Sequence, residues 1–348
     1  MKHKILIISA KNNYVRGKLF TESIKKKYSL SFVQYSGNFF LKNFKLFSIL
    51  FLKYDLIFIC WPLWSSIFII KLINLFKKKP IIYDAFTLSH EDYLDNYKTQ
   101  NFIFKKFYEF IDKFVLISCD GLITDTEQHK NKILEIVKNK TKTDVIEVCQ
   151  KNYKVFNKIN KNSKLNILHA GANRRCHDIP KMVDLINELP KEIKQKIIFK
   201  IVTDDYFNNY KNLIKNLNCN KYIQIINHLK FNQYLKIIKN CDLCLGTFGK
   251  SDKSNNIISN FIVTSLNFGK VVVTSDTRAA KYYLNNNKGV ILLKNPQNLN
   301  FKKFLMKYLI SISFRKSLNG KSKKIFNKNF RALENLKKLD KIIRNYLE

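Results

Sequence analysis

Short runs of β-branched and aromatic residues alternate with longer amphipathic stretches along the chain. In the first half these runs predict strands at 4–8, 30–34, 56–61, 80–84, 121–124 and 145–148. Helical periodicity lies between several of them, for example at 19–27 and 102–118. Such strand–helix alternation is typical of βαβ units that build a mostly parallel sheet.

A polar stretch rich in Asn and Lys, 150–164, interrupts this pattern and predicts a linker. The alternation then restarts, with strands predicted at 165–169, 197–203, 223–226, 242–246, 271–274 and 290–293, and helices at 179–189, 208–217, 231–240 and 257–268. We therefore expect an α/β protein of two doubly wound domains, whose sheets bind ligands at the carboxyl ends of their strands.

The strongly positive net charge raises the question of which partner the chain binds. The 348 residues include 63 Lys and Arg against 26 Asp and Glu, which gives a formal charge of +37. Nucleic-acid binding, attraction to anionic lipid or a phosphorylated substrate, and a bias toward Lys and Asn codons each explain it. Because no helix-turn-helix, zinc finger or RNP motif is present, we expect no nucleic-acid partner.

The cysteines and the amino terminus indicate a cytoplasmic protein. Seven scattered cysteines fit a reducing compartment better than a disulfide framework. Cys241 and Cys244 form a C-x-x-C pair, but no second ligand pair accompanies it, and alternation in a strand predicts that they face opposite sides. We expect no signal peptide, because only a short apolar run, 5–8, opens the chain.

The most apolar region, 44–76, does not predict a spanning helix, because charges and Pro62 interrupt it. Its segment 63–76 fits either a buried helix or a surface helix that enters the lipid headgroup region beside Lys77–Lys79. A surface helix of this kind, together with the basic tail, predicts that the protein binds peripherally to the anionic inner face of the cytoplasmic membrane.

The segment 242–293 carries the strongest chemical signal, and its core is 242–276. Its strand ends in the flexible turn 246–249, and Lys250 and Lys253 follow. A helix that begins near 256–258 would present free N–H groups and the positive end of its dipole to an anion. A diphosphate suits these groups, and an ordinary βα loop is the alternative.

Residues 241–276, CDLCLGTFGKSDKSNNIISNFIVTSLNFGKVVVTSD, resemble the donor half of the family 4-like GT-B glycosyltransferases. KYDLIFICWP, KPIIYDAF and DGLITDT in the first half are similar to a bacterial surface-glycan branch of that group. The resemblance implies two Rossmann-like domains at 1–155 and 163–320, and a basic helix at 321–348 that packs back on the first domain. It also implies a retaining, metal-independent transferase without a cofactor.

The resemblance assigns the donor-binding residues. They lie in the loop GANRRCH, at strand ends and near the helix: Gly171, Arg174, Arg175, His177, Thr203, Thr247, Phe248, Gly249, Lys250, Asn256 and Asn260. The arginines suit a bidentate diphosphate clamp. Two glutamates that the group often carries fall on Asn256 and Thr264, so a carboxylate for the ribose is missing. This departure favours the alternative of a degenerate, non-catalytic GT-B protein that binds a sugar or scaffolds another transferase.

Polar residues after the strand 80–84 are candidates for catalysis, because a carboxylate or His at a strand end can orient or deprotonate an acceptor hydroxyl. The candidates are Asp84, His90 and Asp92, and a solvated loop with helix caps is the alternative. Lys11, Arg16 and Ser89 are placed on the acceptor side. The leading hypothesis is transfer from a nucleotide-diphosphate sugar to a glycan or lipid-linked acceptor, in surface polysaccharide or lipooligosaccharide assembly.

Overall fold

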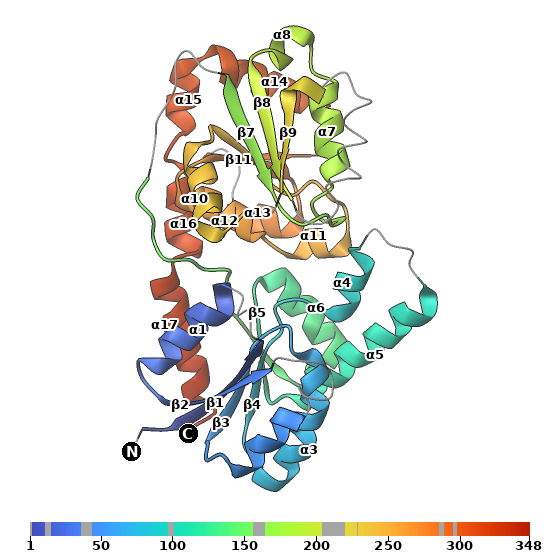
Figure 1. Cartoon of the computed structure of the whole chain (residues 1–348), viewed down its shortest axis with the longest axis vertical. Coiled ribbons are helices and arrows are strands. Elements are labelled where there is room, and N and C mark those ends of the chain that lie inside the picture. Colours follow the sequence, from blue (N-terminus) through green and yellow to red (C-terminus); the bar gives the residue numbers. More distant parts are fainter. Residues whose placement is uncertain are drawn as a thin grey trace. The chain divides into compact units, whose positions relative to one another are not determined.

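A computed structural model describes residues 2–10, 15–35, 44–96, 101–155, 164–203, 220–227, 229–284, 289–294 and 298–348 (Figure 1). The chain divides into two compact units. The first comprises Met1–Leu94, Lys98–Cys149 and Ala332–Glu348, and the second comprises Asp95–Tyr97 and Gln150–Arg331.

The first unit contains a parallel six-stranded sheet of order β2-β1-β3-β4-β5-β6. Its strands are β1 (Lys4–Ala10), β2 (Ser29–Tyr35), β3 (Leu56–Ile59), β4 (Ile81–Asp84), β5 (Gly121–Thr124) and β6 (Lys142–Val145). They form where β-branched residues cluster, and both faces of the central strands are buried, as in parallel sheets covered by helices on both sides.

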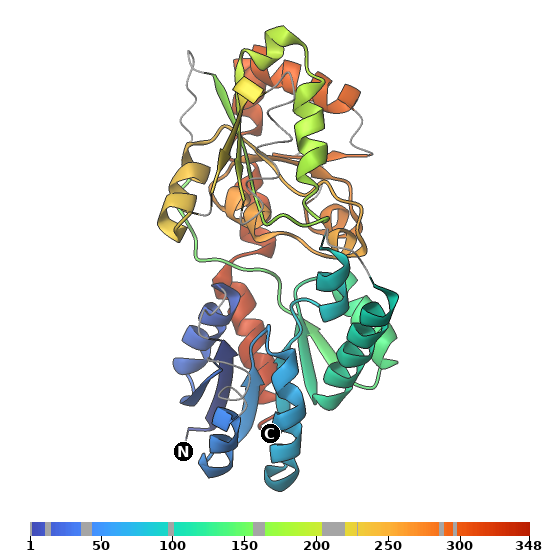
Figure 2. The same cartoon turned by 45° about the vertical axis from the view of Figure 1, so that its right-hand side comes forward.

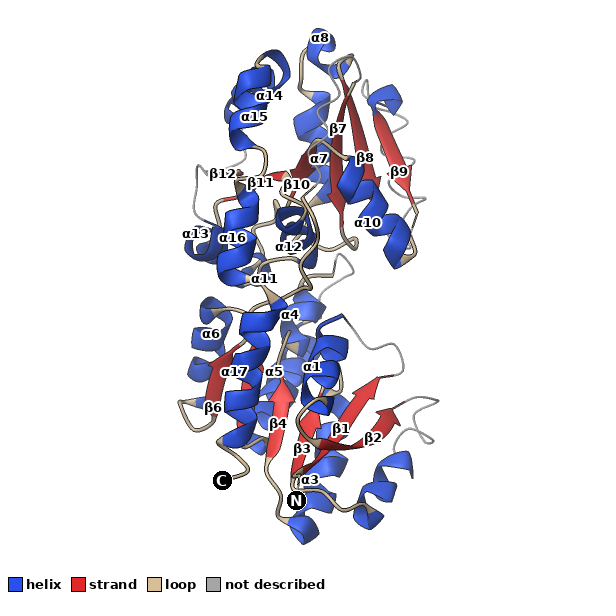
Figure 3. Ribbon diagram, turned by 90° about the vertical axis from the view of Figure 1, so that its left-hand side faces the viewer, coloured by secondary structure: helices blue, strands red, loops and turns tan. Residues whose placement is uncertain are grey.

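Successive residues of β1 alternate between two apolar cores. Ile5 and Ile7 pack with α1 (Val15–Lys25) and α17 (Ala332–Arg344), which cover one face of the sheet (Figure 3). Leu6 and Ile8 belong to the core on the other face, which is covered by α3 (Ile67–Lys77), α5 (Phe102–Ser118) and α6 (Glu127–Val137). The described part of the unit also contains the shorter helices η1 (Ser48–Phe51), η2 (Trp64–Ser66) and α4 (Ser89–Leu94).

The second unit contains a parallel six-stranded sheet of order β12-β11-β10-β7-β8-β9. Its strands are β7 (Leu165–Ala170), β8 (Ile197–Val202), β9 (Ile223–Ile226), β10 (Leu243–Leu245), β11 (Val271–Ser275) and β12 (Val290–Leu293). Its helices are α7 (Ile179–Asn187), α8 (Lys191–Lys194), η3 (Asn220–Tyr222), α10 (Phe231–Asn240), α11 (Asp252–Asn256), α12 (Asn260–Asn267), α13 (Arg278–Leu284), α14 (Asn298–Ile310), α15 (Ile312–Leu318) and α16 (Ser322–Asn329).

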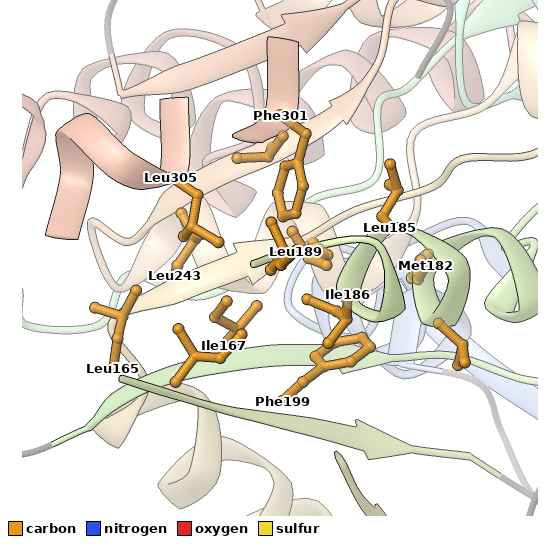
Figure 4. Packing of buried hydrophobic residues seen from close by; sticks show 14 of the residues in the cluster. Leu165, Ile167, Met182, Leu185, Ile186, Leu189, Phe199, Leu243, Phe301 and Leu305 are labelled. Atoms are coloured by element: carbon orange, nitrogen blue, oxygen red, sulfur yellow. The ribbon is translucent and has the colours of Figure 1, made fainter. Parts of the chain in front are cut away.

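Figure 4 shows the main core of this unit, in which strand side chains meet α7 and α14. Ile167 and Phe199 contribute from the sheet, Ile186 from α7, and Phe301 and Leu305 from α14. The cluster is buried and fixes the strands whose carboxyl ends carry the candidate site.

The expected α/β class with two doubly wound sheets is confirmed, and most predicted strands match observed ones. The last strand of the first sheet was expected at 145–148 but is Lys142–Val145, because Gly121–Thr124 pairs with that segment. As an edge strand, β6 tolerates polar residues that do not suggest a strand by themselves. The helix expected at 208–217 lies outside the described residues.

The helix expected at 257–268 is wrong in its start. Ile257 and Ser259 have extended backbones, so they separate α11, which ends at Asn256, from α12. The Ser259 side chain accepts a hydrogen bond from the Ile262 N–H and caps α12, which therefore begins at Asn260.

The prediction that Cys241 and Cys244 face opposite sides is also wrong. Cys241 ends α10 and precedes the strand, so strand alternation does not apply to it. The two sulfurs lie 3.4 Å apart and are buried.

Candidate functional site

The second sheet has its topological switch point at the neighbouring strands β7 and β10. The chain continues from β7 toward β8 on one side and from β10 toward β11 on the other. Because all strands are parallel, the loops that follow β7, β8, β10 and β11 leave from one edge of the sheet. Doubly wound folds bind their ligands at this position.

Two loops at this edge are held together by their backbones. The Phe248 N–H donates to the carbonyl of His177 (3.2 Å), and the Gly249 N–H donates to that of Cys176 (3.1 Å). A Cβ at position 249 would lie 1.9 Å from the carbonyl oxygen of Arg175. Only glycine permits this approach, which explains the glycine at the end of the 246–249 turn.

Asp95 braces both loops, although it stands far from them in the sequence and no motif identifies it. Its buried Oδ1 accepts hydrogen bonds from the Cys176 N–H (2.7 Å) and from the Ser251 hydroxyl (3.0 Å). Its carbonyl accepts from the Arg175 N–H (2.8 Å). Through these contacts Asp95 belongs to the second unit. Lys253 adds a positive charge 4.0 Å from Oδ2.

The cationic candidates stand in the same two loops. Arg175 and Lys250 are exposed, and Arg174 is half-buried. Arg174 and Arg175 follow β7, whereas Lys250 follows β10, so positive charge comes from both sides of the switch point.

His169, at the end of β7, is fully buried. Its Nδ1 bonds to the carbonyl of Leu245 (2.8 Å), so Nδ1 must carry the proton. Its Nε2 is therefore left as an acceptor, and it has no hydrogen-bond partner among the described residues. Burial lowers the pKa of His169 to about 4, and the ring is neutral near pH 7.

Three other polar atoms at this edge of the sheet are buried in the same way as His169 Nε2. Nδ1 of His177, Oγ1 of Thr203 and Oγ of Ser275 are buried without a hydrogen-bond partner among the described residues. Loss of solvation and the nearby His169 lower the pKa of His177 well below its usual value. Its ring lies 5.2 Å from that of His169 and would be 2.5 Å from a Cβ at Gly171. Such atoms usually have a water or a ligand as their partner.

Arg16 and Asp84 form a buried ion pair in the first unit. The Arg16 Nε donates to Asp84 Oδ1 at 3.0 Å, and its other nitrogens donate to the carbonyls of Thr124 and Ile146. Burial raises the pKa of Asp84, and the Arg16 charge opposes that rise. Arg16 thus fastens the ends of three strands, and Lys11, its companion in the prediction, lies outside the described residues.

His90 and Ser89 stand at the first turn of α4. Asp112 of α5 accepts from both backbone N–H groups (2.8 and 2.9 Å) and bonds to Nδ1 of His90 (2.7 Å). Asp112 therefore caps α4 and orients the His90 ring. Asp92 is half-buried one position beyond Glu91. Asp84 and His90 are thus engaged with different partners.

A second buried ionic group was missed by sequence reasoning. His129 lies 3.0 Å from Asp125 and 3.6 Å from Glu91, which also pairs with Lys132 at 2.7 Å. Burial alone would lower the pKa of His129, but Asp125 and Glu91 outweigh it and raise the pKa. Burial would raise the pKa of Glu91, but the positive charges of His129 and Lys132 outweigh it and lower that pKa. The charged forms are stabilised mutually.

The comparisons with known proteins report on the fold. No protein-family model and no curated protein matches the sequence. Solved structures do match along its full length. Anabaena HepE in complex with UDP-glucose is 10% identical over 99% of this chain and 100% of its own, with a TM-score of 0.73.

Sucrose-phosphate synthase from Thermosynechococcus elongatus is 10% identical over 99% of each chain, with a TM-score of 0.76. A glycosyltransferase from Rickettsia africae is 16% identical over 100% of this chain and 99% of its own, with a TM-score of 0.68. The chain has the GT-B fold. At these identities the likeness establishes the fold alone.

In this GT-B chain the positions expected to hold glutamates are both buried. Oδ1 of Asn256 accepts from Arg278, the first residue of α13, at 3.2 Å. The Thr264 hydroxyl donates to the Asn260 carbonyl (2.7 Å) and accepts from Gln150 (2.7 Å). Arg278 is a further cation near the site that the sequence motifs did not indicate.

Among the described residues of the GT-B chain, no group of His, Cys, Asp and Glu is arranged to hold a metal ion. The same residues contain no helix that is both long and apolar enough to cross a membrane.

Proposed function

We propose that this GT-B protein is a glycosyltransferase whose second unit binds a nucleotide-diphosphate sugar. The observation that carries the proposal is a set of buried polar atoms at the carboxyl ends of the second sheet, on His169, His177, Thr203 and Ser275, which have no hydrogen-bond partner among the described residues. They accompany cationic side chains from two loops, which suits a ligand with both sugar hydroxyls and phosphates. The similarly folded HepE was crystallised with UDP-glucose.

In the proposed reaction, catalysis comes mainly from positioning and electrostatics. Arg174, Arg175 and Lys250 would neutralise the diphosphate as it leaves, with retention of the anomeric configuration. Because these side chains supply the positive charge, we propose that no metal or cofactor is needed. Transfer that persists unchanged in EDTA would support this point, and loss that Mg²⁺ restores would contradict it.

The acceptor is proposed to bind through the first unit. Asp84, His90 and Asp92 are the candidates for orienting or deprotonating its hydroxyl, with Ser89 beside them. Arg16 would act by holding Asp84, because its own guanidinium is buried in that pair. Lys11 remains an acceptor-side candidate.

We further propose a glycan or lipid-linked acceptor in surface polysaccharide or lipooligosaccharide assembly, at the inner face of the cytoplasmic membrane. The charge of +37 supports a location beside anionic lipid. No nucleic-acid partner is proposed, because no recognition motif accompanies the charge.

A thermal-shift screen with UDP-, GDP-, CMP- and dTDP-sugars tests the proposal. We expect at least one to raise the melting temperature of the wild type, and Arg174→Ala/Arg175→Ala to reduce that shift. Lys303→Ala/Lys316→Ala is the matched control, because it removes two charges from α14 and α15 of the same unit. If no nucleotide sugar stabilises the wild type, the proposal fails.

A second candidate function is a non-catalytic GT-B protein that binds a sugar or scaffolds another transferase. Asn256 and Thr264, which stand where carboxylates are expected, favour it. Stabilisation by a nucleotide sugar without any hydrolysis or transfer would support this candidate, whereas turnover of the donor would exclude it.

A further inference from the structure

α5 is apolar on two opposite sides, and only one of them serves the core. Val115 and Leu116 belong to the buried side. On the other side, exposed residues recur at helical spacing: Ile103, Phe107, Phe110, Phe114 and Ile117. A water-soluble surface would place polar residues at such positions, so this stripe requires an explanation.

α3 extends the stripe into a broad surface. Its exposed residues Phe68, Leu72, Leu75 and Phe76 also recur at helical spacing. The ring centroids of Phe68 and Phe114 lie 5.9 Å apart, so the two helices present one continuous surface, and Figure 2 shows them on the same side of the first sheet. We call these nine residues of α3 and α5 the α3–α5 face.

Positive charge borders the α3–α5 face. Lys71, Lys77, Lys78 and Lys79 lie on and after α3, and the sequence from 67 to 80 contains no acidic residue. Three of these lysines line a hollow of about 520 Å³ at this end of α3. Lys106 and Lys113 flank the stripe on α5, where Glu109 pairs with Lys106 at 2.8 Å.

We propose that the α3–α5 face binds an anionic lipid bilayer, with its phenylalanines at the boundary of headgroups and acyl chains and its lysines on lipid phosphates. Exposed Phe and Leu bordered by lysines are the composition of interfacial helices. A symmetric contact with a second copy would bring two lysine-bordered faces of like charge together, which disfavours a homodimer.

The proposal deepens the proposed membrane location by naming its surface, and it leaves out the basic tail. α17 packs against the opposite face of the first sheet, in the core that contains Leu339, Ile342 and Ile343. Since the test reads lipid binding alone, its failure would leave the proposed sugar transfer unaffected.

The experiment is co-sedimentation of the full chain with vesicles of equal parts phosphatidylcholine and phosphatidylglycerol, and with phosphatidylcholine alone. We expect binding to the anionic vesicles and much weaker binding to the neutral ones. Phe76→Ser/Phe110→Ser should reduce the partition coefficient about ten-fold or more, because both rings are exposed (79% and 69%) and would lose their insertion. Lys77→Gln/Lys113→Gln should reduce it roughly five-fold per lysine.

The matched control is Ile310→Ser/Leu333→Ser, which removes two similarly exposed apolar side chains (75% and 60%) that are not part of the α3–α5 face. It should bind as the wild type does, and all variants should keep the wild-type melting temperature. Equal loss in the control and the phenylalanine variant would overturn the proposal, as would absence of vesicle binding. A wild-type dimer that Phe76→Ser/Phe110→Ser converts to monomer would assign the face to a second copy instead.

Discussion

At the residue scale, buried titratable groups divide into two kinds. Arg16 with Asp84, and His129 with Asp125 and Glu91, are ionic groups that find their partners inside the first unit. His169 is a neutral group with one hydrogen-bonded nitrogen and one acceptor nitrogen that no described residue contacts by a hydrogen bond. The first kind positions strands and helices, and the second is available to a ligand, so the two kinds predict different responses to mutation and pH.

Arg16→Met should destabilise the protein by about 3–5 kcal/mol, because it leaves the Asp84 carboxylate buried without its partner. The double variant Arg16→Met/Asp84→Asn should recover part of that loss, since no uncompensated charge remains. Urea denaturation measures both, with the exposed Arg175→Met as a control that changes stability by roughly 0.5 kcal/mol or less. A cost below about 1 kcal/mol for Arg16→Met would contradict a buried pair.

His169 should make stability fall in acid. Its pKa is lowered from 6.5 to about 4, so between these values the unfolded chain binds a proton that the folded chain does not. Stability therefore rises with pH through this window, by about 3 kcal/mol in total. We expect His169→Gln to flatten that part of the profile of unfolding free energy against pH. His129, whose pKa is raised, makes stability change with pH in the opposite direction. An unchanged slope in His169→Gln would contradict a buried, neutral His169.

At the element scale, the loops after β7 and β10 depend on the absence of a side chain at Gly249. Gly249→Ala should separate the loops, because its Cβ would meet the rigid carbonyl of Arg175. Gly121→Ala is a suitable control, since its Cβ would meet the side chain of Tyr346 in the first unit. We expect nucleotide-sugar thermal shifts to disappear in the first variant and to persist in the second. Equal thermal shifts in both variants would show that donor binding does not depend on the close contact at Gly249.

The order of these elements could be predicted from the sequence, because apolar runs at strand length are local signals. Contacts between residues that are far apart in the sequence could not be predicted. Arg16 meets Asp84, Thr124 and Ile146, and Asp95 reaches Cys176, through tertiary packing that no spacing encodes. The later start of the helix predicted at 257–268 was missed because Ser259 acts as a cap within an otherwise apolar helical pattern.

At the scale of the whole molecule, two units of the GT-B fold carry different surfaces. The second unit gathers polar atoms and cations at its switch point, and the first carries the buried ionic groups and the α3–α5 face. The cations that make up the net charge of +37 therefore need not share one role. We propose that a few cations bind the phosphates of the donor and that the lysines bordering the α3–α5 face bind lipid, whereas the rest of the charge has no assigned role.

The most direct test of the central claim is hydrogen exchange of the full chain with and without UDP-, GDP-, CMP- and dTDP-sugars. We expect at least one of them to slow exchange in the loops 171–177 and 246–256, with little change in the strands of the first unit. Protection confined to the first unit, or no protection by any of the four, would contradict donor binding by the second unit.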